Sequence, residues 1–178
     1  MSEVYLKKAK KTPETGTSET RKIVERMLSE IEIGKEKIAK KYASDLDGFN
    51  GDIIVSQESI ENASKMVPEK LKDDIKFAHE RIKKFAEAQK QSISEFETEL
   101  SPGLWAGQKL IPIQTAGCYV PGGRYAHVAS AIMSITTARV AGVENIIACS
   151  APKGEDGPNP AILYTCLLYT SPSPRDCK

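Results

Sequence analysis

The side chains and turns best suited to chemistry lie in the segment 117–127, which combines glycines, an arginine and a histidine. Glycine adopts backbone angles that other residues resist and proline fixes φ, so Pro121-Gly122-Gly123 predicts a sharp turn. Where such a turn enters a helix, backbone N–H groups and the helix dipole together favour an anion. Arg124 and His127 would add side-chain donors beside it. The stretch therefore indicates an anion-binding turn.

The known phosphate-binding loops do not match this turn. Gly117 and Gly122 have the spacing of a Walker loop, but Gly123-Arg124 stands where lysine and serine or threonine are required. The Gly-x-Gly-x-x-Gly motif of dinucleotide-binding folds is not present in the sequence. A tight turn between a strand and a helix, with no ligand, explains the glycines equally well. The spacing alone leaves both interpretations open.

The flanking residues predict the elements that would position the turn. Residues 116–120 predict a short buried strand, and residues 126–141 are small or apolar on every side, which is typical of a buried helix. Gly142 would cap this helix at its C-terminus, and residues 145–150 predict a second strand. Together they predict a strand–turn–helix–strand unit with a parallel sheet and a right-handed crossover.

The chain before this unit is expected to be helical. Apolar stripes on both sides of Gly34 predict a helix that begins at Thr17 or Ser18 and is interrupted at the glycine. Ser56 would cap a short helix that runs to about Val67.

A longer helix is predicted for residues 68–91, with Pro68 as its first residue. Its apolar side chains alternate spacings of four and three, which indicates a seam packed on another helix. His79 lies beside that seam, where a half-exposed structural role is expected. The seam consists of Leu71, Ile75, Ala78, Ile82 and Phe85.

The segment between the helices and the parallel unit contains one predicted turn and one predicted strand. Pro102-Gly103 marks the turn, and residues 107–113 predict the strand. Pro112 lacks an N–H group, so this strand is expected at a sheet edge. Trp105, the one tryptophan, is expected to pack against other side chains.

Composition limits the classes of function. The 178 residues are 40% hydrophobic, which is enough for a core, and 25 basic against 24 acidic residues favour no nucleic acid partner. No apolar run reaches membrane length and the N-terminus lacks a signal-peptide core, so no membrane partner and a cytoplasmic location are expected. The four cysteines have no metal or redox spacing, and Cys118 and Cys149 are expected to be buried on strands.

The motif Gly-x-Tyr-Val-Pro-Gly-Gly, followed by Ser-Ala-Ile-Met, Ala-Arg-Val-Ala-Gly-Val and Ile-Ile-Ala-Cys-Ser-Ala-Pro, resembles the histidinol dehydrogenase family. The resemblance covers about residues 4–164. It implies a homodimeric, NAD- and zinc-dependent enzyme that oxidises a primary alcohol through an aldehyde to a carboxylate. It also implies that Tyr119, Gly122 and Gly123 bind NAD, and that the start of the helix at Ser130 lines the substrate cleft.

One departure from the family bears on the substrate. Ala129 stands where members that use L-histidinol have a serine, and Arg-Tyr-Ala-His fills the preceding turn. That turn resembles a branch that acts on sulfopropanediol, so Arg124 and His127 would face the anionic end of a small alcohol. L-Histidinol is the alternative substrate. A solvated charge for Arg124, and a helix cap or packing role for His127, are the alternatives for these residues.

The fold class that follows is α/β, with an N-terminal helical segment before the start of an incomplete Rossmann-like parallel-sheet domain. The expected parts are a polar arm (1–16), a helical region (17–98), the beginning of the NAD-binding domain (99–164) and a tail (165–178). Asn159-Pro160 would open a last helix. The tail resembles a translated sequencing adapter, and its prolines would stop that helix.

The resemblance places the family's zinc ligands and catalytic Glu-His pair further along than this chain reaches. No catalytic or metal-binding residue is therefore predicted here, and the chain alone is expected to be inactive. Two other classes of function stay open from the sequence. One is a non-catalytic nucleotide- or anion-binding module built on the glycine turn, and the other is a helical interaction protein that uses residues 17–91.

Overall fold

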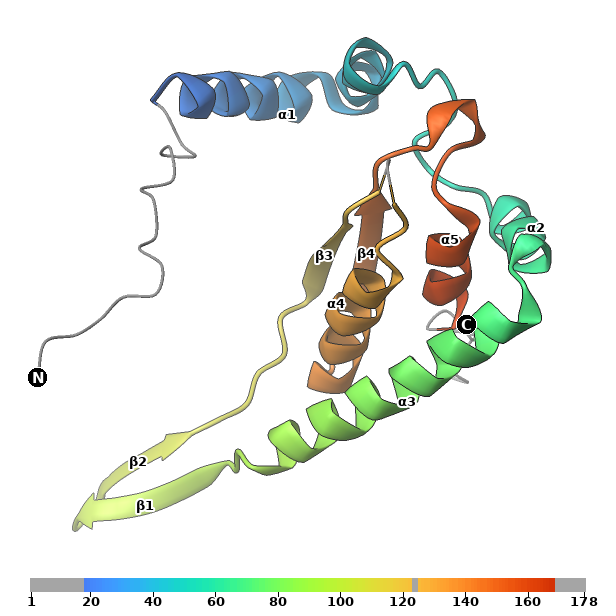
Figure 1. Ribbon diagram of the computed structural model, residues 1–178. Coiled ribbons are helices and arrows are strands. Elements are labelled where there is room, and N and C mark those ends of the chain that lie inside the picture. The colour runs from blue at the N-terminus through green and yellow to red at the C-terminus, as the bar shows by residue number, and fades with distance from the viewer. Residues whose placement is uncertain (1–17, 123–124, 169–178) are drawn as a thin grey trace, which may run out of the picture.

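A computed structural model describes residues 18–122 and 125–168 (Figure 1). The predictions for Thr17, Gly123, Arg124, the polar arm and most of the tail lie outside these residues. The elements, in chain order, are α1 (Ser18–Asp47), α2 (Gln57–Met66), α3 (Glu69–Gln91), β1 (Phe96–Ser101), β2 (Leu104–Gln108), β3 (Thr115–Val120), α4 (Val128–Ala141), β4 (Asn145–Ser150), the 3-10 turn η1 (Gly154–Asp156) and α5 (Pro160–Leu167).

The predicted parallel unit is confirmed. Strands β3 and β4 pair in parallel, with Thr115 opposite Asn145 and Val120 opposite Ser150. Helix α4 connects them and ends at Gly142, whose φ of 94° is in the left-handed region that glycine tolerates. The α/β fold class with preceding helices is therefore confirmed.

Helix α4 is apolar on every side because two layers cover it. On one side, Ala131 and Ile135 pack with Cys118 and Val120 of β3. On another side, Ile132 belongs to a second cluster that contains Ile75 of α3. Helix α5 contributes to both clusters, so it closes the core at the end of the described chain.

The seam of α3 is confirmed in its central part. Ile75 is buried, and Ala78 and Ile82 pack against the same cluster. At both ends the prediction is wrong, since Leu71 is 37% and Phe85 is 64% exposed, and Ala86 is buried where Phe85 was expected. Pro68 immediately precedes the first helical residue of α3 rather than being that residue.

The predicted capping residues of α2 and α5 have the expected contacts. Ser56 Oγ accepts the N–H of Ser59 at 3.1 Å, and Asn159 Oδ1 accepts the N–H of Ala161 at 2.9 Å. Within α5, Thr165 is fully buried and its hydroxyl donates to the Ala161 carbonyl at 2.7 Å. Both helices thus begin with satisfied backbone donors.

Helix α1 is interrupted as predicted, directly after Gly34. Lys35 has φ 50° and ψ −137°, so the two helical halves meet at a kink. The helix extends away from the core (Figure 1), and its apolar stripe is largely exposed, including Ile23 (47%) and Leu28 (61%). Packing within the described residues therefore does not hold α1 in place.

The strand predicted for residues 107–113 is wrong. Strands β1 and β2 form an antiparallel hairpin that extends from the body (Figure 1), with its turn at Gly103 as predicted. Strand β2 ends at Gln108, and Pro112 lies outside any strand. Beyond the end of β2, the Leu110 N–H donates to the Glu95 carboxylate at 2.9 Å and not to a strand partner. Trp105 is 59% exposed, so its expected packing role is also wrong for the described chain.

Replacing Lys35 with glycine is expected to stabilise the kink of α1. A side chain at positive φ lowers the stability of the local backbone by on the order of 1 kcal/mol. This free energy corresponds to about a five-fold change in the protection of nearby amides. Hydrogen exchange of the amides around residue 35 should therefore slow by about that factor. The matched Lys37→Gly change lies within the helix and should accelerate exchange, because glycine weakens a helix by about 1 kcal/mol. Acceleration by both changes would contradict the strained geometry at Lys35.

Candidate functional site

The candidate site lies where the two parallel strands end. Because β3 and β4 run in the same direction, Val120 and Ser150 finish at the same edge of the sheet. Residues 121–122 and the loop 151–159 leave from that edge (Figure 1). In open parallel sheets, ligands bind outside the carboxyl ends of the strands. The glycine turn is therefore at the edge where a ligand is expected.

Gly122 lies where the two exit loops touch. A Cβ atom added to it would be 2.5 Å from Ser150 Oγ and 2.6 Å from the Ala151 carbonyl oxygen. Both distances are shorter than a carbon–oxygen contact allows, and one neighbour is backbone. Glycine is thus required at this position for packing of the turn, whether or not the turn binds an anion. Ser150 and Ala151 were not predicted to take part, although the parallel pairing of Val120 with Ser150 would have indicated them.

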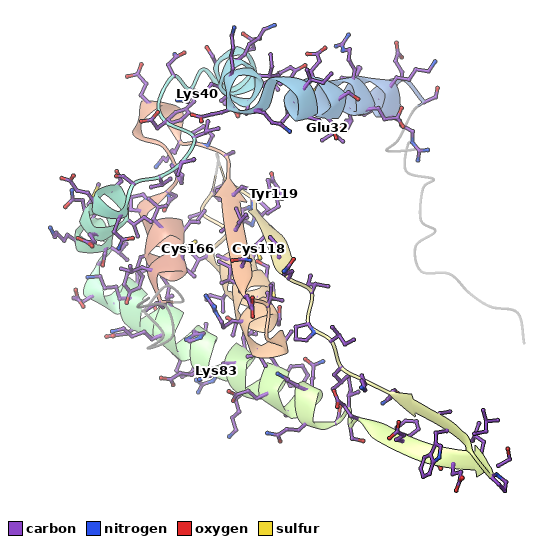
Figure 2. All side chains as sticks on the ribbon, turned by 180° about the vertical axis from the view of Figure 1, so that it is seen from behind. Glu32, Lys40, Lys83, Cys118, Tyr119 and Cys166 are labelled. Atoms are coloured by element: carbon purple, nitrogen blue, oxygen red, sulfur yellow. The ribbon has the colours of Figure 1, made fainter. Side chains whose placement is uncertain are left out.

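Tyr119 is accessible at the end of β3. Its side chain is 67% exposed and lies on the side of the sheet away from α5 (Figure 2). The neighbouring residues Cys118 and Val120 point to the opposite side and are buried. Cys149, which pairs with Tyr119 in the register, is exposed, so its expected burial is wrong. Cys118 is buried as predicted.

His127 and Ser130 lie at the first turn of α4. His127 occupies the N-cap position, but its exposed side chain makes no capping hydrogen bond, so the alternative of a side-chain cap is wrong. Its carbonyl accepts the Ser130 N–H at 3.0 Å. Ser130 is half-buried, and Ala129 is exposed beside it. Helix α4 begins near the edge where β3 ends, one residue after Tyr119, so the structure brings these residues to one edge.

A cleft that the sequence did not indicate adjoins the loop after β4. It has a volume of about 680 Å³ and lies between α2 and the loop after β4. Its polar lining includes Ser59, Asn62, Lys153 and Glu155. The residues are far apart in the sequence and share no motif, so only the folded chain reveals the cleft.

No metal site is found among the described residues, since no group of three or more His, Cys, Asp or Glu side chains converges there. Burial raises the pKa of the Cys166 thiol to about 11, with Cys118 nearby, which disfavours the thiolate form that ligates a metal. Burial lowers the pKa of His79, which is half-buried as predicted. No helix in the described part is long and apolar enough to span a membrane.

Helices before a parallel β–α–β unit, with a glycine turn at the carboxyl edge, define an α/β protein of the kind that binds a ligand at that edge. Comparison with known families then gives a direct match: the histidinol dehydrogenase family model matches residues 10–170. The chain belongs to the histidinol dehydrogenase family. The match extends into residues 165–178, for which an adapter origin stays a prediction.

Individual relatives agree with this assignment. The chain is 54% identical to a histidinol dehydrogenase homolog of Pelagibacter ubique, over 94% of this chain and 40% of that protein. It is 50% identical to the sulfopropanediol 3-dehydrogenase of Ruegeria pomeroyi, over 92% of this chain and 38% of that protein. The crystal structure of histidinol dehydrogenase from Elizabethkingia anophelis superposes with a TM-score of 0.80 at 30% identity, covering 88% of this chain and 36% of that one. The chain thus spans about 40% of the length of the curated relatives it matches.

Proposed function

We propose that this chain is the amino-terminal portion of a dehydrogenase that oxidises a small primary alcohol through the aldehyde to a carboxylate. The observation that carries the proposal is the family match over residues 10–170. NAD is the proposed hydride acceptor, and a homodimer in the cytoplasm is the proposed form of the whole enzyme.

The described residues fit a nucleotide better than they fit zinc. Gly122 brings the backbone of the turn against the loop after β4, with the first turn of α4 directed at the same edge. N–H groups and the dipole of a helix start favour a phosphate there, and the exposed ring of Tyr119 offers a surface for a flat group. For zinc, the described residues offer no set of ligands. No step of the reaction is therefore assigned to a metal held by them.

A sulfopropanediol-like substrate is proposed ahead of L-histidinol. Identity is 50% with the sulfopropanediol 3-dehydrogenase and 30–39% with the relatives named histidinol dehydrogenase. Arg124 and His127 follow the glycine turn, and Ala129 leaves no hydroxyl at the second residue of α4. A guanidinium offers a fixed fork of donors that suits a sulfonate.

The test uses a full-length chimera, in which residues 1–168 of this chain replace the matched segment of the sulfopropanediol 3-dehydrogenase. NADH formation is measured with 2,3-dihydroxypropane-1-sulfonate and with L-histidinol. We expect kcat/KM to be at least about tenfold higher for the sulfonate. L-Histidinol has no sulfonate, so it would leave the charged group of the site without a partner. A preference for L-histidinol would reverse the substrate assignment, and inactivity of a folded chimera with both alcohols would contradict the dehydrogenase.

Arg124 gives a second prediction within the chimera. Arg124→Ala is expected to lower kcat/KM for the sulfonate by about 10- to 100-fold, because a hydrogen bond to a charged group contributes about 1.5–3 kcal/mol. Arg21→Ala removes the same charge from exposed α1 and serves as the control, with no change expected. If the two variants have equal kcat/KM values, Arg124 does not contact the substrate.

A further inference from the structure

Helix α1 consists of two helical parts that meet at Gly34 and Lys35. Lys35 has φ 50° and ψ −137°, which are not helical angles, and the two parts run in different directions (Figure 1). A Cβ atom added to Gly34 in the first part would overlap Cγ1 of Ile38 in the second. The kink therefore depends on glycine at position 34, because any other residue would push the two parts away from each other.

A hydrogen bond joins the two parts across the kink. The Tyr42 hydroxyl donates to Glu30 Oε2 at 2.6 Å, between residues that are 12 positions apart. In a continuous helix such residues are separated by about 18 Å along the axis and by about a third of a turn around it. Their side chains project sideways and could not meet there. The bond therefore requires the kink, and we call it the latch.

The charges around the latch are consistent with its geometry. The hydrogen bond to Glu30 is the main reason why the pKa of Tyr42 is above its ordinary value, and the charges of Glu30 and Asp45 add to the rise while that of Arg26 opposes it. Arg26 Nε lies 3.8 Å from Glu30 Oε1, the oxygen that the latch does not use. Tyr42 is thus held in its neutral form, which is the form that donates the hydrogen bond.

Contacts beyond the helix hold the second part of α1. Lys40 Nζ donates to Asp52 Oδ1 at 3.0 Å, and Ser44 Oγ donates to Asn50 Oδ1 at 2.8 Å, so the second part is tied to the loop that follows it. The structure describes α1 in full, and none of its residues is buried. Packing therefore does not fix the direction of residues 18–34, and the contacts at the kink decide it.

We propose that the kink of α1 is a latched hinge: the hydrogen bond from Tyr42 to Glu30 holds residues 18–34 at an angle, and its loss lets α1 extend as one continuous helix. Two opposing terms set the balance. The latch favours the kinked form, whereas Lys35 at positive φ is strained there and would be relaxed in a continuous helix. Because both parts are already helical, opening the hinge changes the backbone mainly at Lys35. The proposal stands apart from the proposed function, since it uses only the contacts of α1.

The phenolic pKa of Tyr42, measured by NMR in the chain itself, tests the latch. Tyr42→Phe identifies the signal, because it removes one tyrosine resonance. The pKa should be above the ordinary tyrosine value in the unchanged chain, and Glu30→Gln should lower it toward that value. Glu25→Gln removes the same charge from the first part of α1 and should leave the pKa unchanged. An ordinary pKa in the unchanged chain, or equal effects of the two substitutions, would overturn the proposal.

Gly34→Ala tests the hinge. The added methyl group would overlap Ile38, and alanine favours a helix over glycine, so α1 should extend. The pKa of Tyr42 should then fall toward its ordinary value, and the amides of residues 34–38 should exchange about fivefold more slowly. Lys37→Ala, which lies within the second part, should change neither. In each variant, unchanged exchange of β3 shows that the body is folded. If Gly34→Ala accelerated exchange at residues 34–38 while the pKa of Tyr42 stayed raised, the kink would be fixed and the hinge would be wrong.

Discussion

Replacing Ile135 with alanine is expected to lower the free energy of unfolding by about 2–5 kcal/mol, as for other buried isoleucines. Ile135 is 3% exposed and joins α4 to β3 and α5 in one cluster. Its truncation leaves a cavity among neighbours that close-packed elements hold in place. Urea denaturation followed by circular dichroism measures the change.

Met133 supplies the control for this prediction. It lies on the same helix and is 51% exposed, so Met133→Ala should alter the free energy of unfolding by less than about 1 kcal/mol. If both variants lose stability equally, α4 does not have the covered and uncovered sides described above.

Gly122→Ala is expected to destabilise the chain by about 1–3 kcal/mol through overpacking. The new methyl group would collide with the Ser150 hydroxyl and the Ala151 carbonyl, so the two exit loops would have to separate. In the full-length chimera the same change should raise the KM for NAD, because the turn and the start of α4 would be displaced together.

Gly117→Ala is the matched control, since a methyl group there meets no atom within 4 Å. Its effect on the free energy of unfolding of the chain alone should stay within about 1 kcal/mol. Equal destabilisation by the two substitutions would show that the close approach at Gly122 is not what requires glycine.

The parallel unit could be predicted from the sequence because its signals are local. The apolar strands, the all-round apolar helix and Gly142 each specify one element, and right-handed crossover chirality joins them. The caps at Ser56 and Asn159 were predictable for the same reason, since each side chain bonds a backbone N–H two or three residues ahead.

The hairpin was missed because every second residue of its first strand is polar. Residues 96–101 alternate Phe, Thr and Leu with glutamates and serine, a period-two pattern that an apolar-run criterion overlooks. The strand was predicted at residues 107–113 instead because residues 110–113 are apolar, although Pro112 lacks a backbone N–H donor. The exposure of β4 was missed for a different reason. Ile147 and Cys149 have the sequence of a buried strand, but the described chain has no element that covers them.

Of the candidate site, the turn and its position at a helix start were predictable, while its contacts were not. The approach of Gly122 to Ser150 depends on residues 28 positions apart, which only the parallel register brings together. The lack of a side-chain cap at His127 likewise depends on backbone angles that residue type does not determine.

Hydrogen exchange of the full-length chimera with and without NAD tests the central claim most directly, namely that the carboxyl edge of β3 and β4 holds the cofactor. Saturating NAD should slow exchange in residues 119–130, by at least about tenfold for the most affected amides, and leave the hairpin at 96–108 unchanged. Protection confined to other segments, with residues 119–130 exchanging as fast as in the free protein, would contradict it.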